Sequence, residues 1–306
     1  MEVRRLVVDA CETDENEGEA KEESTARLTD APGGAHLTHL IAALSHRDVL
    51  LKCKVANAVG SLCTSRVAGQ RLLELHGDAL IASLSRMATS KNTWAQADAF
   101  FVFGWIVVVG DDELVAQQLV RFIATAIRLL VRNLRRQDSH EPLEEQDTNL
   151  RIYCLVFLLN FSQRDCAALE PQLVELLEML QLLVGRLLEA TSELLGEGDC
   201  GGQDVGERIA EHIEFVRLTV TLLNAVVDQV EAAPATIITL KMLPQLLKLE
   251  QTLYQDDLEA TLRGLQIEDT YDTQGIEDDG ERETSGELDE LRERMRCIKE
   301  TVLAHR

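Results

Sequence analysis

Apolar residues recur along most of this chain every three or four positions, which is the spacing of amphipathic helices. The pattern fills residues 36–265 and returns at 287–306. Leu, Ala and Val supply most of the hydrophobicity, while aromatic residues make up only 4% of the chain, a composition that favours packed helices over sheets. We therefore predict an all-α protein.

Acidic segments interrupt the helical pattern and divide the chain into domains. We predict that residues 1–35 and 266–286 are disordered, because they are polar, acidic and poor in apolar residues. The runs at 9–30 and 268–293 together supply −17 of the formal net charge of −23, so the body at 36–265 is only mildly negative. Such acidic tails either keep a protein soluble or attract basic partners.

The C-terminal segment 287–306 carries its own apolar stripe. Its members are Leu288, Leu291, Met295, Ile298 and Val302. Their spacing predicts one amphipathic helix, which either packs on the body or acts as a separate binding segment. We favour packing, since the apolar stripe would otherwise be exposed to water.

The body contains internal repeats. LIAALS at 40–45 returns as LIASLS at 80–85, and LVFLLN at 155–160 aligns with TVTLLN at 219–224. We infer four helical repeats, at 36–77, 78–119, 120–172 and 173–249, followed by a cap that ends near 265. Repeats of about 40–47 residues that contain only helices are typical of HEAT and armadillo proteins.

Four segments resemble the third helix of an armadillo repeat. They are VANAVGSL at 55–62, DAFFVFGWI at 98–106, CLVFLLNFS at 154–162 and TVTLLNAVV at 219–227. The resemblance covers residues 36–265 and implies a right-handed superhelical solenoid whose third helices line a concave groove. Small residues on these helices let neighbouring helices approach closely.

The resemblance also implies a set of binding residues. In armadillo proteins that hold extended peptides, an Asn on each third helix bonds the ligand backbone, and Asn160 and Asn224 occupy that position here. Ser61 and Trp105 take its place in the first two repeats. The Trp found one turn earlier in nuclear-import adaptors is replaced, in order, by Asn57, Phe101, Val156 and Val220. We therefore do not expect a receptor for nuclear-localisation signals.

Two alternatives stay open at these positions. An Asn here bonds either a ligand or the backbone of a neighbouring repeat. Trp105 is either an interface anchor, together with Phe101 one turn earlier, or a core residue packed among apolar neighbours.

One basic stripe stands out in this acidic chain. Its members are Arg121, Arg128, Arg132 and Arg135. They share one helical face in a stretch, 120–136, that contains no acidic residue. Such a face could bind an acidic or phosphorylated segment, or it could pair with the protein's own acidic loop at 138–147 or with water.

Sequence signals for catalysis are lacking. The chain has no GxxxxGK[ST], GxSxG or HExxH motif, and His36 and His39 have no further ligand with which to complete a metal site. We expect no enzyme activity, no cofactor and, at this net charge, no direct nucleic-acid binding.

The apolar run at 100–109 is too short to cross a membrane. Seven cysteines without a CxxC pair favour a reducing compartment, the cytoplasm or nucleus.

These observations lead to a functional hypothesis. We expect a non-catalytic adaptor or scaffold that binds a protein or peptide partner in the concave groove of the solenoid. The alternative is an armadillo-type co-chaperone, such as a nucleotide exchange factor for a seventy-kilodalton heat-shock chaperone. The sequence identifies neither the partner nor the oligomeric state.

Overall fold

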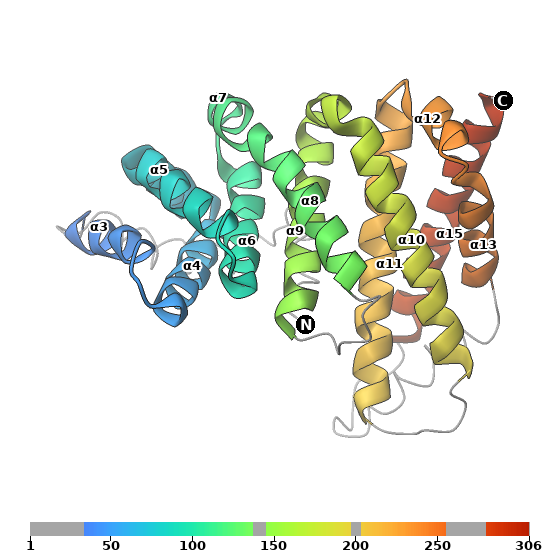
Figure 1. The fold of residues 1–306 in the computed structure, drawn as a ribbon, viewed down its shortest axis with the longest axis horizontal. Coiled ribbons are helices and arrows are strands. Elements are labelled where there is room, and N and C mark those ends of the chain that lie inside the picture. Colours follow the sequence, from blue (N-terminus) through green and yellow to red (C-terminus); the bar gives the residue numbers. More distant parts are fainter. Residues whose placement is uncertain (1–33, 137–144, 197–202, 255–279, 306) are drawn as a thin grey trace. The chain divides into compact units, whose positions relative to one another are not determined.

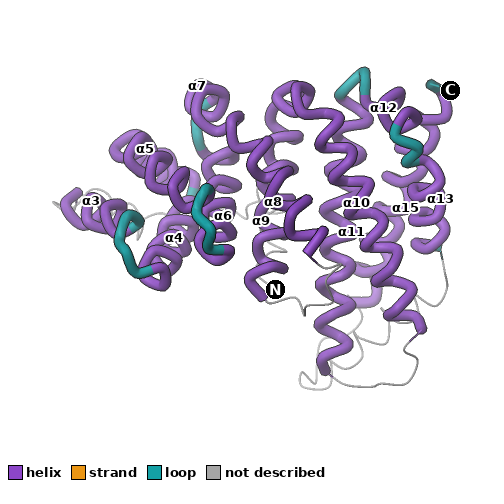
Figure 2. Tube along the Cα trace, viewed as in Figure 1, coloured by secondary structure: helices purple, strands orange, loops and turns teal. Residues whose placement is uncertain are grey.

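The computed structural model describes residues 34–136, 145–196, 203–254 and 280–305 as helices joined by short turns (Figures 1 and 2). No β-strand occurs in these four stretches. The prediction of an all-α protein is therefore confirmed. Contacts within the chain define two compact units, 1–164 and 165–306, and each unit is described here by itself.

The first unit contains seven α-helices and two short irregular turns of helix within its described residues. These elements are α3 (Gly34–Ala43), α4 (Val49–Cys63), α5 (Arg66–Ala88), α6 (Thr93–Val109), α7 (Asp112–Leu114), a π-helical turn (Val115–Leu119), a 3₁₀ turn (Val120–Phe122), α8 (Ile123–Arg136) and α9 (Glu145–Asp165).

Polar side chains fix where these helices begin. Asp48 accepts a 2.9 Å hydrogen bond from the backbone N–H of Leu50 at the start of α4. Asn92 accepts one of the same length from Ala95 at the start of α6. Each cap satisfies an N–H group that has no partner inside its helix and stabilises that helix by about 1 kcal/mol.

Phenylalanines form the centre of the first unit. Phe100 and Phe103 on α6 are fully buried, and their ring centroids lie 5.3 Å and 6.2 Å from that of Phe157 on α9. Phe103 also stacks on Phe122, just before α8, at 4.4 Å. Burying each ring stabilises the fold by about 2–3 kcal/mol. The same residues join α6 to α9 and to the 3₁₀ turn that precedes α8.

One predicted repeat boundary is wrong. The break expected after Gly77 falls in the middle of α5, which continues unbroken from Arg66 to Ala88. A single Gly costs a helix only about 1 kcal/mol, and here no Pro or change of pattern accompanies it. Burial of Gly77 and of the leucines on either side outweighs that cost.

The stretch from Asp112 to Arg136 is the one described helical run that is long and apolar enough to cross a membrane. It passes this test by length and composition alone, and its most apolar window is 44% buried inside the protein. Core helices of soluble proteins pass the same test, so the run is weak evidence for a membrane span.

The second unit is also built from helices. Its described elements are a 3₁₀ segment (Cys166–Gln172), α10 (Leu173–Gly196), α11 (Gln203–Gln229), α12 (Ala233–Thr239), α13 (Leu243–Leu253) and α15 (Gly280–Ala304). The break predicted at 172/173 coincides with the start of α10.

The C-terminal helix packs on this unit, as the stripe predicted. α15 contacts α11 and α13, and every member of the stripe is buried. The helix begins at Gly280, so residues 280–286 are helical rather than part of the predicted linker. The predictions for 1–33 and 266–279 concern segments outside the described residues, and they stay predictions.

Candidate functional site

Helix α6 is buried on most of its surface but carries one partly exposed stripe, which we call the α6 stripe. Its members are Trp94, Asp98, Phe101, Trp105 and Val108. They are spaced by four and three residues in turn, so they share one helical face. Trp94 is 41% exposed and Val108 37% exposed, while Phe101 and Trp105 are half-buried. Large apolar side chains therefore meet solvent along one line of an otherwise buried helix.

Phe101 lies at the centre of the stripe and contacts helices on both sides. A Cβ atom at Gly60 of α4 would lie 2.2 Å from the Phe101 ring, so only glycine permits this approach. On the other side, the ring centroid of Tyr153 on α9 lies 5.1 Å from that of Phe101. Phe101 therefore lies between α4 and α9.

A buried carboxylate lies within the stripe. Asp98 Oδ1 accepts a 3.1 Å hydrogen bond from Asn57 Nδ2, whereas its buried Oδ2 has no hydrogen-bond partner among the described residues. Burial raises the pKa of Asp98, although hydrogen bonds from Cys53 and Asn57 act in the opposite direction. Burial, followed by the effect of Asp98, raises the pKa of Cys53 to about 12. The thiol is therefore protonated at neutral pH and is not an activated nucleophile.

Trp105 is partly buried and partly exposed, so its burial alone does not choose between an anchor and a core residue. Its side chain is half-buried, while its indole Nε1 is buried and has no acceptor within the described part of the chain. A buried, unsatisfied N–H group costs about 1–3 kcal/mol. Part of the side chain is therefore packed inside the unit, and part of its ring is presented at the stripe.

The predicted binding residues belong to both units. Ser61, Phe101, Trp105 and Asn160 lie on the neighbouring helices α4, α6 and α9 of the first unit, whereas Asn224 lies half-buried on α11 of the second. Asn160 is buried, and its Nδ2 donates a 2.9 Å hydrogen bond to the backbone oxygen of Gly104. This is the bond between helices that the sequence left as one alternative.

Ser61 is exposed and differs from Asn160 in its bonding. Its hydroxyl donates a 2.9 Å hydrogen bond to the backbone oxygen of Asn57, one turn earlier in α4. It can exchange this bond for one to a ligand without breaking a contact between helices.

The arginine residues Arg128, Arg132 and Arg135 are exposed on α8. Arg132 donates a 2.8 Å hydrogen bond to Gln96 Oε1 on α6, and Arg128 bonds its own helix at Thr125. Arg136, which is not a member of the predicted stripe, lies 3.6 Å from Asp147 on α9. Most of the acidic loop at 138–147 lies outside the described residues, so the pairing of the stripe with this loop stays a prediction.

Sequence reasoning missed three parts of this site. Trp94 precedes the armadillo-like segment, and Tyr153 stands one residue before another such segment. Asp98 is the first residue of the armadillo-like segment at 98–106, and a charged residue beside an apolar run is a signal of a buried polar group. Its partner Asn57 is 41 residues away, and helical periodicity carries no information about that pairing.

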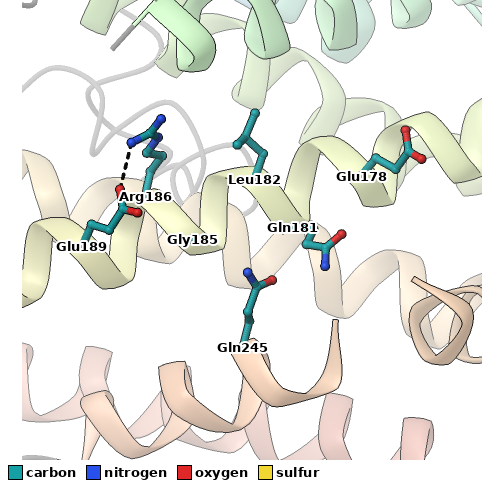
Figure 3. Close-up of a pocket in the computed structure, with 7 residues that line it drawn as sticks. All are labelled: Glu178, Gln181, Leu182, Gly185, Arg186, Glu189 and Gln245. Atoms are coloured by element: carbon teal, nitrogen blue, oxygen red, sulfur yellow. Dashed lines mark hydrogen bonds and ion pairs between the residues drawn. The ribbon is translucent and has the colours of Figure 1, made fainter. Parts of the chain in front are cut away.

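The second unit has a shallow groove of about 350 Å³ between α10 and α13. Gln245 points from α13 towards Gln181 and Gly185 on α10 (Figure 3). Gln181 Nε2 donates a 3.2 Å hydrogen bond to the backbone oxygen of Leu240, and Gln245 Oε1 is buried without a partner in the described stretches. The groove has polar walls and no arrangement of acid, base and nucleophile.

His212, also in the second unit, lies in a closed apolar site. Its Nε2 is 2.8 Å from Thr191 Oγ1, and burial lowers its pKa to about 4.

No group of three or more potential metal-ligating side chains occurs among the residues that the structure describes. Comparison with protein-family models gave no match, and comparison with curated proteins gave none either.

Proposed function

We propose that this protein is a non-catalytic adaptor that binds a segment of another protein along the α6 stripe. The observation that carries the proposal is the partial exposure of Trp94, Phe101, Trp105 and Val108 on a helix whose other faces are buried. Aromatic residues dominate binding energy at interfaces, because they bury large areas at little cost in conformational entropy.

The dimensions of the stripe favour a peptide or helix over a small molecule. Trp94 and Val108 are fourteen residues apart on α6, which corresponds to about 21 Å along the helix axis. Asn57 and Ser61 are exposed on the neighbouring α4 and offer hydrogen bonds at the edge. An apolar line with a polar rim matches the usual anatomy of a protein interface.

We also propose that the helices form armadillo-like repeats. The motif at 40–45 begins in α3, and the similar motif at 80–85 lies within α5. These two helices pack together. The helices that follow them, α4 and α6, also pack side by side (Figure 1). The four armadillo-like segments all lie inside long helices, namely α4, α6, α9 and α11.

The free cysteines Cys53, Cys63, Cys154 and Cys166 are buried, which supports a cytoplasmic or nuclear location.

A pair of matched variants tests the binding proposal. The stripe variant carries Trp94→Ala and Val108→Ala, the two most exposed apolar positions on α6. The control carries Val67→Ala and Leu75→Ala, which are 53% and 44% exposed on α5 of the same unit. Full-length wild type and both variants are used for affinity purification with quantitative mass spectrometry, and an enriched partner is then purified and titrated against each chain.

The proposal expects a partner that the control retains and that the stripe variant binds at least about tenfold more weakly, since two anchors are removed. A crosslinker placed at Val108 should reach the same partner. If every enriched protein binds the stripe variant as well as wild type, the stripe is not the interface. A stripe-dependent partner that is a heat-shock chaperone, with faster nucleotide release on binding, would assign the co-chaperone role instead.

A further inference from the structure

Helix α8 and the 3₁₀ turn before it contact α6 on the side that lies opposite the α6 stripe. Gln96 and Phe103 are seven residues apart on α6 and contact Arg132 and Phe122. Gln96 is two positions from Asp98, which places it about 200° around the helix from the stripe. A ligand on the outer face of α8 therefore does not compete for the surface used by the proposed adaptor function.

The outer face of α8 and the turn before it form what we call the arginine face. Its members are Arg121, Arg128, Arg132 and Arg135. All four are exposed, and within the described ranges none of them forms a salt bridge with an acidic side chain. Their partners are uncharged. Arg128 donates a hydrogen bond to Thr125 and Arg132 donates one to Gln96, while the guanidinium of Arg121 lies over the ring of Phe122.

The arginine face lies in a helical stretch that has more basic than acidic residues. Residues 34–136 contain 12 Lys and Arg against 7 Asp and Glu, although the unit 1–164 as a whole carries −4 and the whole chain −23. The stretch around the face therefore attracts anionic groups locally, while the protein as a whole repels large polyanions.

We propose that the arginine face binds an acidic segment, rich in Asp and Glu, of a partner protein. Arg128 and Arg135 are seven residues apart, so their Cα atoms are about 10.5 Å apart along α8. The whole face spans about 21 Å, the length of six or seven residues of extended chain. Guanidinium groups bind carboxylates through two parallel hydrogen bonds, which gives such a segment several fixed points.

The packing of α8 argues against an anionic membrane as the ligand. The apolar side of the helix, including Ile127, Leu130 and Leu134, is buried in the protein. A membrane-surface helix needs that side free, because it inserts into the boundary between headgroups and acyl chains. An acidic peptide needs only the exposed arginines.

Fluorescence anisotropy with the full-length protein tests this inference. The probe is a fluorescein-labelled oligoglutamate peptide, and single-stranded DNA of similar length and phosphatidylserine vesicles serve as competing ligands. The face variant carries Arg121→Glu, Arg128→Glu and Arg135→Glu. The control carries Arg47→Glu, Arg66→Glu and Arg71→Glu, which change the charge of the same unit equally at other exposed positions.

The inference expects salt-dependent peptide binding that the face variant weakens at least about tenfold and the control much less, because the charge-assisted bonds are local. Equal thermal unfolding midpoints show that both variants fold. If the two variants lose peptide affinity equally, net charge and not the arginine face determines binding. If DNA or vesicles bind more tightly than the peptide, the face is assigned to those ligands. Either result overturns the proposal.

The chain's own acids between Asp9 and Asp30 provide an internal competitor at high effective concentration. A further variant replaces these nine acids with the corresponding amides, and the proposal expects it to bind the peptide at least as tightly as wild type. Absence of peptide binding to both wild type and this variant at low salt would overturn the inference. These outcomes are independent of the partner titration with the stripe variant.

Discussion

The side-chain amide of Asn160 donates a 2.9 Å hydrogen bond to the backbone oxygen of Gly104, so α9 is tied to the middle of α6. Asn160→Ala should lower the free energy of unfolding by about 1–3 kcal/mol, because it removes a buried hydrogen bond between two helices and the packing of the amide that makes it. Urea unfolding followed by circular dichroism measures this loss.

Asn224→Ala is the matched control for this prediction. Asn224 is half-buried, and no hydrogen bond of its side chain occurs within the described residues. We expect its replacement to change stability by less than about 0.5 kcal/mol. Equal destabilisation by the two substitutions would contradict the structural role assigned to Asn160 alone.

Gly60 should tolerate no larger residue as long as Phe101 keeps its place. A Cβ atom there would lie 2.2 Å from the Phe101 ring, so Gly60→Ala should cost about 1–3 kcal/mol through displacement of that ring. Adding Phe101→Leu should recover part of the loss, because the smaller side chain leaves room for the methyl group. Denaturant unfolding of the single and double variants gives both values.

Gly286 on α15 provides the comparison for Gly60. A Cβ atom at Gly286 would meet nothing within 4 Å, so Gly286→Ala should stabilise the helix by up to about 1 kcal/mol. If Gly60→Ala were also neutral or stabilising, the close contact between α4 and Phe101 would not limit this position.

His212 should make the protein sensitive to mild acid. Burial lowers its pKa to about 4 from the usual 6.5, so the neutral ring is the form that the folded protein stabilises. This contribution is fully present above pH 6.5 and is lost as the pH falls towards 4. At pH 5 the loss is about 2 kcal/mol relative to pH 7.

The variant His212→Gln separates this effect from that of the carboxylates. Thr191 donates its hydroxyl proton to the backbone oxygen of Leu187, so it accepts a hydrogen bond from Nε2 of His212, and a Gln amide can replace that donor. The variant should lose less stability between pH 7 and pH 5 than wild type, by about 2 kcal/mol. Identical pH profiles would show that His212 titrates normally.

Thiol labelling should distinguish Cys297 from Cys63. Cys297 is exposed, whereas Cys63 is buried, and burial raises its pKa to about 12. We expect iodoacetamide at pH 8 to modify Cys297 in the native protein and Cys63 only after unfolding. Peptide mass spectrometry measures both rates, and comparable native rates would mean that α4 opens readily.

Periodicity predicted those parts of the fold that depend on one helix at a time. The stripe from Leu288 to Val302 could be recognised because its spacing alone determines which side is buried. The continuity of α5 through Gly77 could not, since burial against other helices decides whether a glycine ends a helix.

The site depended on contacts between distant residues, and the sequence predicted it less well. Asn160 and Asn224 occupy equivalent positions in similar segments, yet only Asn160 is seen to bond a neighbouring helix. The difference arises from the backbone of Gly104, 56 residues earlier in the chain. Asp98 likewise acquires its environment from Asn57, and neither pairing follows from helical spacing.

The packing of α15 has a consequence for folding during translation. Contacts of the first unit lie among residues made before Asp165, so that unit can become compact while synthesis continues. The second unit cannot, because α15 covers α11 and α13 and emerges from the ribosome after both of them. Until it does, the apolar surface around Leu249 and Leu253 is open to chaperones and to other nascent chains.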